Sequence, residues 1–289
     1  MVNMIKIGCL GPDGTFSRFA TDRWMQFIHL DAELVFFSSI PSIIDAVESS
    51  DIQLGVVPVE NTIEGPVNAA HDAMVQTKST QIRAEFLIPV GLDLFAKTPL
   101  DLADITDVAS HPQPLAQCQQ FIQDQLPKTV RLHVAPSTAF AANQLAKSYS
   151  FSMESILDTS AVIGGRWLGG MFDLCQIAEG IQDMKENQTR FWVIGREVPL
   201  PESTIKTSVV FSLPQNQPGG LATALGVFGK HGINLTSIGS RPTKTGLGHY
   251  LFFIDAEHNH SEMSLALSEL KGVAAHMRHL GTYPFFQEI

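Results

Sequence analysis

The chain has 289 residues, a length that fits one large domain or two unequal ones. With 44% hydrophobic and 17% charged residues, it has the composition of a folded globular protein, which excludes a largely disordered chain. The net charge of −10 and the lack of a basic cluster argue against a nucleic-acid partner. An anionic ligand would therefore need local positive charge, from Arg side chains and helix N-termini.

The cysteines and the apolar runs of the sequence indicate in which cellular compartment the protein is expected. Cys9, Cys118 and Cys175 are odd in number and lack the spacing of a metal site, which favours buried free thiols in a reducing environment. The apolar run 4–10 ends at residues 11–13 and is too short for a signal peptide. No uncharged apolar run approaches the ~20 residues that span a bilayer. We expect a cytoplasmic protein with neither a membrane nor a nucleic acid as partner.

Short apolar strands alternate with amphipathic helices in the first part of the chain. Strands are predicted at 5–10, 34–37 and 54–57. Such alternation predicts an α/β fold with parallel strand pairing and helices on both faces of the sheet. Ligands then bind at the carboxyl ends of the strands, where residues 11–17 and 60–65 lie. Two helices are predicted between these strands. The apolar face of the first contains Phe16, Phe19, Ala20, Trp24 and Phe27. The second has its N-cap at Ser39, and its apolar face contains Ile43, Ile44 and Val47.

The same alternation continues from Phe86 to about Gly170. The expected elements there are a strand at 105–109, a helix with Leu115, Cys118 and Ile122, a strand at 131–134, and a helix opening at Ser137 and Thr138. Further along the chain, a helix-like segment from Ile177 to Met184 is expected before a strand at 191–194.

The pattern changes beyond a proline-bearing linker. Alternating and helical periodicities there give the order βαββαβ, which is that of a ferredoxin-like unit. Its expected elements are strand 207–213, helix 220–230, strands 234–241 and 250–255, helix 262–270 and strand 277–280.

Several motifs stand in a fixed order along the chain. Those of the first 196 residues are Leu10–Ser17, Val57–Gly65, Ser110–Gln113 and Asn187–Phe191. Together they closely resemble prephenate dehydratases, and the resemblance runs over about residues 4–289. The motifs of the last part resemble an ACT domain of the phenylalanine-sensing kind: Lys206–Ser208, Pro218–Leu221, Ile233–Thr236 and Ser240–Pro242.

The resemblance implies a two-lobed, periplasmic-binding-protein-like α/β catalytic domain with a cleft between the lobes, followed by the ferredoxin-like ACT domain. The catalytic domain is then expected at 1–196, the linker at 197–205 and the ACT domain at 206–289. Within the catalytic domain, lobe 1 is expected to comprise about 1–85 and 171–196, and lobe 2 about 86–170.

The implied activity is conversion of prephenate into phenylpyruvate, with loss of water and CO2, in L-phenylalanine biosynthesis. Losing both groups makes the ring aromatic, so we expect no metal or other cofactor. Because the first strand begins at about residue 4, there is no room for the chorismate mutase domain of fused versions, and a monofunctional enzyme is expected. The alternative is a non-catalytic two-lobed protein that binds and senses an amino acid or keto acid, which would not need the Thr189-Arg190-Phe191 motif.

By resemblance, Thr189 is the residue that assists the departing hydroxyl, as a hydrogen-bond donor or as part of a relay. Without the other motifs, Thr189 would be a β-branched residue at the start of a strand. Arg190 either holds a substrate carboxylate or braces the site against Glu60 or Glu64. Phe191 is expected to pack at the edge of the cleft.

Further substrate contacts are expected from loop residues at strand ends and helix starts, where backbone amides suit a carboxylate. His111 lies beside these residues, but a histidine near a helix start is more often structural. Glu60 and Glu64 resemble a glycosidase acid/base pair only by spacing. The expected substrate-binding residues are Thr15, Phe16, Ser17, Glu60, Asn61, Thr62, Ser110, Gln113, Ser137, Thr138, Arg190 and Phe191.

The ACT resemblance implies feedback control by phenylalanine and assembly through the ACT domains, as a homodimer or a dimer of dimers. A glutamate of the usual motif is replaced here by Gly239, which should weaken phenylalanine binding. The expected regulatory residues are Gly219, Gly220, Leu221, Asn234, Leu235, Ser240 and Arg241.

Overall fold

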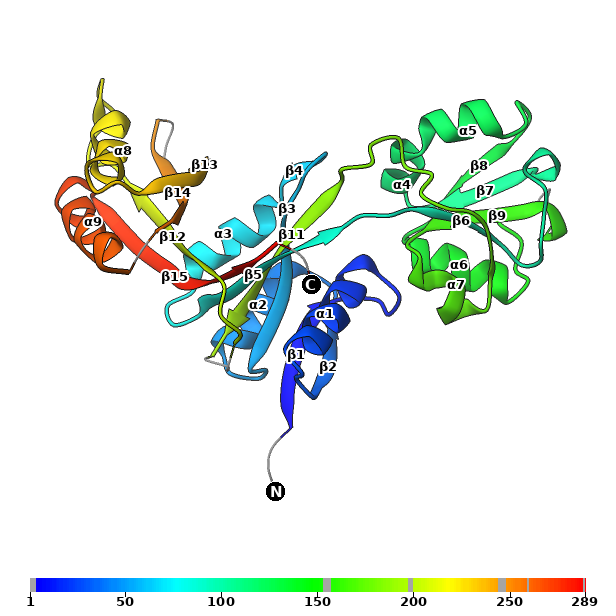
Figure 1. Ribbon diagram of the computed structural model, residues 1–289, viewed down its shortest axis with the longest axis horizontal. Helices are drawn as coiled ribbons and strands as arrows, with labels where there is room; N and C mark the ends of the chain where they lie inside the picture. The colour runs from blue at the N-terminus through cyan, green and yellow to red at the C-terminus, as the bar shows by residue number, and fades with distance from the viewer. Residues whose placement is uncertain (1–3, 153–156, 197–199, 244–247, 259, 288) are drawn as a thin grey trace.

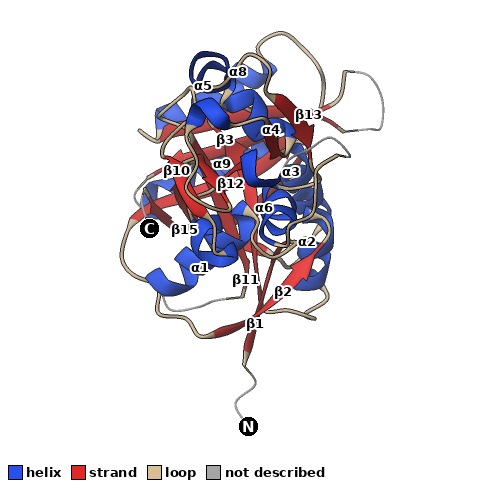
Figure 2. Cartoon of the chain, turned by 90° about the vertical axis from the view of Figure 1, so that its right-hand side faces the viewer, coloured by secondary structure: helices blue, strands red, loops and turns tan. Residues whose placement is uncertain are grey.

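The structure is a computed structural model in which three units lie in a row (Figure 1). Lobe 1 occupies the middle, lobe 2 lies on the right of this view and the C-terminal unit on the left. Figure 2 looks along the row from the side of lobe 2. The structure describes residues 4–152, 157–196, 200–243, 248–258, 260–287 and 289, so residues 197–199 of the expected linker lie outside the described residues.

A ten-stranded sheet runs through lobe 1 and the C-terminal unit. Its order is β13-β14-β12-β15-β5-β11-β3-β1-β2, and β4 pairs with β3. The strands of lobe 1 are β1 (Ile5–Leu10), β2 (Ala32–Phe37), β3 (Leu54–Asn61), β4 (Gly65–Pro66), β5 (Gln81–Pro89) and β11 (Gln188–Gly195).

Helices cover both faces of the lobe 1 sheet. Helix α1 (Phe16–Phe27) buries Trp24 on one face, against Phe86 and Phe191. Helices α2 (Ile40–Glu48) and α3 (Asn68–Gln76) pack on the other face, together with Trp192. Because successive strand residues point to opposite faces, β11 sends neighbouring aromatic rings into two separate cores.

Lobe 2 has its own five-stranded sheet, of order β10-β6-β9-β7-β8. The chain enters it after β5 and returns as β11, which lies beside β5 in lobe 1. Strand β5 stays in the lobe 1 sheet up to Pro89, and β10, which ends at Ala178, still belongs to the lobe 2 sheet, so both changes of sheet fall later than the expected boundaries at 86 and 171. Neither apolar run shows which sheet a strand joins. The elements are β6 (Asp93–Ala96), β7 (Asp107–Ser110), β8 (Arg131–Val134), β9 (Ser160–Gly164), β10 (Cys175–Ala178), α4 (Pro112–Gln117), α5 (Gln119–Gln125), α6 (Thr138–Ala146), α7 (Trp167–Phe172) and the 3-10 turns Leu102–Asp104 and Leu157–Thr159.

The two-lobed α/β class is confirmed, but the strands are not all parallel. Parallel pairs join β1 to β2 and β3, and β7 to β8 and β9. In contrast, β11 runs antiparallel to β3 and β5, and β6 runs antiparallel to β9 and β10. Periodicity shows that a strand exists but not which strand it pairs with, and the strands near the crossovers run the opposite way.

Two helix predictions were wrong in detail. The segment from Ile177 to Met184 is not a helix, because Gly180 has a φ of 60° and the Ile181 amide donates to Leu92 O at 2.8 Å, so its backbone bonds leave the segment. The single helix expected around Cys118 is split there into α4 and α5, since Cys118 has φ −116° and ψ 22°.

The C-terminal unit has the predicted order βαββαβ, which is confirmed. Its strands pair antiparallel, and α8 and α9 pack on the sheet around Phe211 and Phe228. Its elements are β12 (Thr204–Ser212), α8 (Gly220–Lys230), β13 (Asn234–Pro242), β14 (Tyr250–Glu257), α9 (His260–Val273) and β15 (His276–Phe286). In the part of the chain that the structure describes, no helix is long and apolar enough to cross a membrane.

The last strand joins the C-terminal unit to lobe 1. Strand β15 pairs with β12 for most of its length, and Phe285 and Phe286 then pair in parallel with β5 (Figure 1). Gly281 lies where β15 approaches β5, and a Cβ there would be only 2.3 Å from Ile82 O. The junction between the two units therefore requires a residue without a side chain.

We expect Gly281→Ala to lower the free energy of unfolding by about 1–3 kcal/mol, because the two backbones must move apart to admit the methyl group. Urea unfolding of the purified protein measures the loss. Gly272→Ala is the matched control, since nothing lies within 4 Å of a Cβ at that helical position. Equal midpoints for the two variants would contradict the close approach.

Candidate active site

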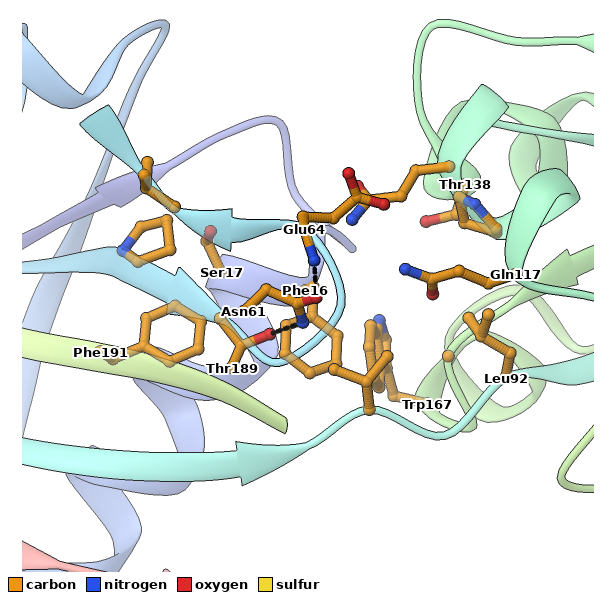
Figure 3. Close-up of a pocket in the computed structure, with 16 residues that line it drawn as sticks. Phe16, Ser17, Asn61, Glu64, Leu92, Gln117, Thr138, Trp167, Thr189 and Phe191 are labelled. Carbon is orange, nitrogen blue, oxygen red and sulfur yellow. Dashed lines mark hydrogen bonds between the residues drawn. The ribbon is translucent and has the colours of Figure 1, made fainter. Parts of the chain in front are cut away.

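A cavity of about 380 Å³ lies between the two lobes (Figure 3). Strands β3 and β11 and the start of α1 form its lobe 1 side, while α4, α6 and α7 form its lobe 2 side. The lining residues are Phe16, Ser17, Pro58, Asn61, Glu64, Val67, Val90, Leu92, Gln113, Pro114, Gln117, Thr138, Gly165, Trp167, Thr189 and Phe191.

The cavity brings together residues from all four motifs of the first 196 residues. The expected site residues that line it are Phe16, Ser17, Asn61, Gln113, Thr138, Thr189 and Phe191. Those that do not line it are Thr15, Glu60, Thr62, Ser110, Ser137 and Arg190.

The residues that do not line the cavity have supporting positions around it. Thr15 and Ser137 accept hydrogen bonds from backbone amides as the N-caps of α1 and α6. The Ser110 hydroxyl donates to Ile163 O at 2.7 Å, and that of Thr62 donates to Gln188 O at 3.1 Å. These side chains hold the elements in place while their neighbours face the cavity.

Strand alternation directs Arg190 away from the cavity. Thr189 and Phe191 line the cavity, so the residue between them faces the other side of the sheet. There the Arg190 guanidinium lies 3.0 Å from Glu60 Oε2, which is the bracing alternative of the two considered for it.

Lobe 2 contributes lining residues that no motif indicated. Gln117 is on α4, and Trp167 begins α7. Val90 and Leu92 lie on the segment that leads into lobe 2. Nothing in the local sequence distinguishes these residues from core positions, so only the closing of the two lobes reveals them.

Asn61 orients the Thr189 hydroxyl. Its side-chain oxygen accepts from the amides of Ile63 at 3.0 Å and Glu64 at 3.1 Å, which places the Nδ2 group on the opposite side. Nδ2 then donates to Thr189 Oγ1 at 3.0 Å (Figure 3). Since Thr189 accepts this bond, and its hydroxyl donates to no acceptor among the described residues, its proton is available to a ligand in the cavity.

A chain of amides extends this arrangement into lobe 2. Asn61 Nδ2 lies 2.8 Å from Asn187 Oδ1, and Asn187 Nδ2 lies 3.4 Å from Gln117 Oε1. Asn187 is 1% exposed, so these bonds are shielded from water. The position of Asn61 is therefore tied to both lobes.

Trp167 closes the cavity from the lobe 2 side. Its indole N–H donates to Gly14 O at 2.9 Å, and its ring stacks on Phe19 with centroids 4.3 Å apart. Gly14 has a φ of 80°, and a Cβ there would be 2.9 Å from Ala139 Cβ of lobe 2. The two lobes thus meet at a glycine that no other residue can replace without moving them apart.

The described wall of the cavity contains the starts of two helices but no cationic side chain. Helices α1 and α6 both begin at its wall, where Phe16, Ser17 and Thr138 lie. Helix N-termini attract carboxylates through their amides and dipoles. No lysine, arginine or histidine is among the described lining residues, and Glu64 is the one charged residue among them. Among the described residues, no group of three or more His, Cys, Asp or Glu is placed to hold a metal ion.

Comparison with known proteins places the chain in a family. The family model of prephenate dehydratase matches residues 7–199, and that of the ACT domain matches residues 207–274. The chain belongs to the prephenate dehydratase family. It is 32% identical to the prephenate dehydratase of Lactococcus lactis subsp. cremoris over 98% of both chains. It is 34% identical to that of Methanocaldococcus jannaschii, over 95% of this chain and 96% of the relative.

A solved structure agrees with this assignment. The prephenate dehydratase of Arthrobacter aurescens, in complex with L-Phe, is 32% identical and superimposes with a TM-score of 0.81. The match covers 97% of this chain and 90% of that one, so it includes both the catalytic domain and the ACT domain.

We expect Asn61→Asp to lower the turnover of prephenate at least about tenfold more than Asn61→Ala does. An aspartate oxygen in place of Nδ2 can only accept, so the Thr189 hydroxyl would donate to it and not to the substrate. The aspartate also adds a negative charge beside a dianionic substrate. Steady-state kinetics of both variants measure kcat, and equal losses would contradict the assigned direction of the hydrogen bond.

Proposed function

We propose that this protein converts prephenate into phenylpyruvate, CO2 and water, for L-phenylalanine biosynthesis. The observation that carries the proposal is the Thr189 hydroxyl, which Asn61 orients in a cavity between the lobes. Family membership supports it over the alternative of a binding and sensing protein without turnover.

The chemistry needs positioning and electrostatics but no redox step. Prephenate carries two carboxylates and a ring hydroxyl. The C–CO2 bond breaks as its electron pair enters the ring, the C–OH bond breaks, and the departing hydroxide takes up one proton to become water. The ring becomes aromatic, which makes the overall reaction favourable. The protein has to hold the substrate and stabilise the departing hydroxyl.

Thr189 is proposed as the group that donates to the departing hydroxyl. A threonine hydroxyl is too weak an acid to give up its proton outright, so it acts as an oriented donor while the proton comes from water. The amides at the starts of α1 and α6 are proposed to hold the side-chain carboxylate of prephenate, together with Ser17, Gln113 and Thr138. The absence of a cation among the described lining residues leaves the ring carboxylate poorly stabilised, which favours its loss as CO2.

We expect Thr189→Val to lower kcat by about 10²–10³, the usual cost of losing one oriented donor to a transition state. The change keeps the β-branched shape and removes the hydroxyl, so kcat and kcat/KM should fall together. Thr189→Ser is the matched control and should keep most of the turnover. The assay follows the ultraviolet absorbance of phenylpyruvate with no cofactor added. Near-normal kcat in the valine variant would refute the role of Thr189.

We also propose that phenylalanine controls the enzyme through the ACT domain and that the protein is at least a homodimer. Gly219, with a φ of 81°, is the N-cap of α8, and Leu221 and Leu235 both pack against the ACT core. Strand β13, which contains Asn234, Ser240 and Arg241, is the edge of the ten-stranded sheet. An edge strand of this kind is usually covered by pairing, which supports assembly through the ACT domains.

Phenylalanine binding is expected to be weak and to tighten in the Gly239→Glu variant. The glutamate of the usual motif is absent, and one charge-assisted hydrogen bond contributes about 1.5–3 kcal/mol, or roughly tenfold in affinity. A side chain fits at this position, since nothing lies within 4 Å of a Cβ at Gly239. Titration calorimetry with phenylalanine compares the affinities.

Gly272→Glu adds the same charge elsewhere on the ACT domain and should leave the affinity unchanged. Light scattering, with and without phenylalanine, reports the assembly in each sample. A monomer at micromolar concentration would contradict the dimer, and equal affinities for the wild type and Gly239→Glu would show that position 239 has no part in binding.

The thiols support a reducing compartment, and we propose the cytoplasm. Burial raises the pKa of Cys9 to about 11 and that of Cys118 to about 12, so both stay protonated and unreactive near neutral pH. Cys175 is also a free thiol in the structure.

A further inference from the structure

Buried charged side chains join the ACT domain to lobe 1 on the face of β11 opposite the cavity. Arg190 is at their centre and is 9% exposed. Its Nη1 lies 2.6 Å from Asp255 Oδ2 and 3.0 Å from Glu85 Oε2. Its Nη2 lies 3.0 Å from Glu60 Oε2. Glu60 and Glu85 belong to lobe 1, whereas Asp255 belongs to β14 of the ACT domain.

Further groups from the ACT domain hold two of these carboxylates in place. The Ser208 hydroxyl donates to Asp255 Oδ1 at 2.6 Å. Lys206 Nζ donates to Glu85 Oε1 at 2.9 Å. Glu85 is fully buried and Asp255 is 5% exposed, so both carboxylates depend on these partners for the hydrogen bonds that water would otherwise make.

Arg190 and Asp255 keep their charges at neutral pH. Burial lowers the pKa of Arg190, but the negative charges of Asp255, Glu85 and Glu60 and the hydrogen bond to Asp255 together outweigh this effect and raise the pKa above its ordinary value. Burial raises the pKa of Asp255, but the charge of Arg190, the hydrogen bonds from Ser208 and Arg190 and the nearby His71 together outweigh this effect, and the pKa lies below its ordinary value. The pair is therefore a permanent ionic contact between the two domains.

This contact lies directly behind the catalytic hydroxyl. In the ladder between β3 and β11, Thr189 is opposite Asn61, and Arg190 is opposite Glu60. On the cavity face the first pair forms the hydrogen bond that orients the Thr189 hydroxyl. On the other face the second pair forms the ion pair. A movement of Arg190 would therefore change how Thr189 faces Asn61.

We propose that Arg190 and Asp255 are positioning residues for the dehydration, neither of which touches the substrate. The Asp255 carboxylate of the ACT domain holds the Arg190 guanidinium against Glu60, and Arg190 in turn keeps Thr189 opposite Asn61. The ACT domain thereby contributes to the geometry of the active site even without an effector. The inference rests on the proposed prephenate dehydratase activity.

Kinetics of Asp255→Asn, Arg190→Lys and the double variant test the proposal. Asp255→Asn removes the charge at nearly constant size, and Arg190→Lys keeps the charge but loses the planar fork that contacts several carboxylates. Each single variant should lower kcat by about ten- to a hundredfold, the scale expected for a small displacement of a catalytic group, with KM changed less than about threefold. The double variant should resemble the slower single variant, because both changes break the same contact.

Asp72→Asn is the matched control. Asp72 pairs with Arg241 in a separate ion pair between lobe 1 and the ACT domain, with oxygen–nitrogen distances of 2.9 and 3.0 Å, and this pair does not include Arg190. Loss of the Asp72–Arg241 pair should loosen the docking of the ACT domain on lobe 1 about as much as Asp255→Asn does, but it should leave kcat within about twofold of the wild type. Thermal melting of every variant shows whether it is folded. Ser208→Ala keeps the Asp255 charge and removes one hydrogen bond to it, so it should lower kcat by about two- to fivefold if Asp255→Asn does not fold.

Three results would overturn the proposal. Normal kcat in folded Asp255→Asn would show that the ACT carboxylate does not position the site. If Asp255→Asn does not fold, normal kcat in Ser208→Ala would have the same meaning. Equal losses in Asp255→Asn and Asp72→Asn would mean that docking in general matters, and not this contact. A higher KM with unchanged kcat in Arg190→Lys would assign Arg190 to the substrate. Failure of the proposed activity is a separate result, because it would appear as no turnover of prephenate by the wild-type protein.

Discussion

The alternation of side chains along β11 is the constraint on which the rest of the structure depends. This strand lies between β3 and β5, so its residues reach both faces of the central sheet. Thr189 and Phe191 face the cavity, and Arg190 faces the ACT domain. A shift of one residue in register would exchange these faces and abolish both arrangements. The hydrogen bond from Asn61 and the ion pair with Glu60 stabilise the same register from opposite sides.

Under the proposed function, an acidic chain binds an anion in this cavity without a cationic side chain among the described lining residues. The starts of α1 and α6 supply amides on opposite walls, one from each lobe. Such a site attracts carboxylates through fixed dipoles that need no reorganisation during the reaction. The positive charge of Arg190, in contrast, is neutralised by carboxylates on the far side of the sheet. Amide dipoles thus lie at the cavity, while the Arg190 charge lies on the other side of the sheet. This separation suits a reaction in which one carboxylate of the substrate must be held and the other must leave as CO2.

The ACT domain is continuous with the catalytic domain at the level of the backbone. Strand β15 belongs to the ACT sheet for most of its length and then pairs with β5. The buried cluster around Glu85 and Arg190 covers the same junction with side chains from both domains. A flexible tether between independent domains would not bury charges in this way, because an unpaired buried charge is costly. Changes in the ACT sheet therefore have a direct structural route to β11.

The sequence by itself was sufficient to predict most elements, the two-lobed class, the βαββαβ unit and the family. Local signals carry these features: Ser39 caps its helix as predicted, and the helix predicted at 220–230 has those bounds in the structure. The motifs likewise identified most of the lobe 1 side of the cavity, since Phe16, Asn61 and Thr189 all line it.

The tertiary structure alone decided which strands pair, which side of the sheet each site residue faces and what lobe 2 contributes. Strand direction, the place where each lobe begins and the loop at Ile181 depend on bonds to distant segments, which periodicity does not encode. Trp167 and Gln117 enter the site only because the lobes close on each other. From the sequence, Arg190 could either hold a substrate or brace the site. The direction of its side chain became clear only when β11 was placed between β3 and β5, because the sheet decides which face a strand residue points to.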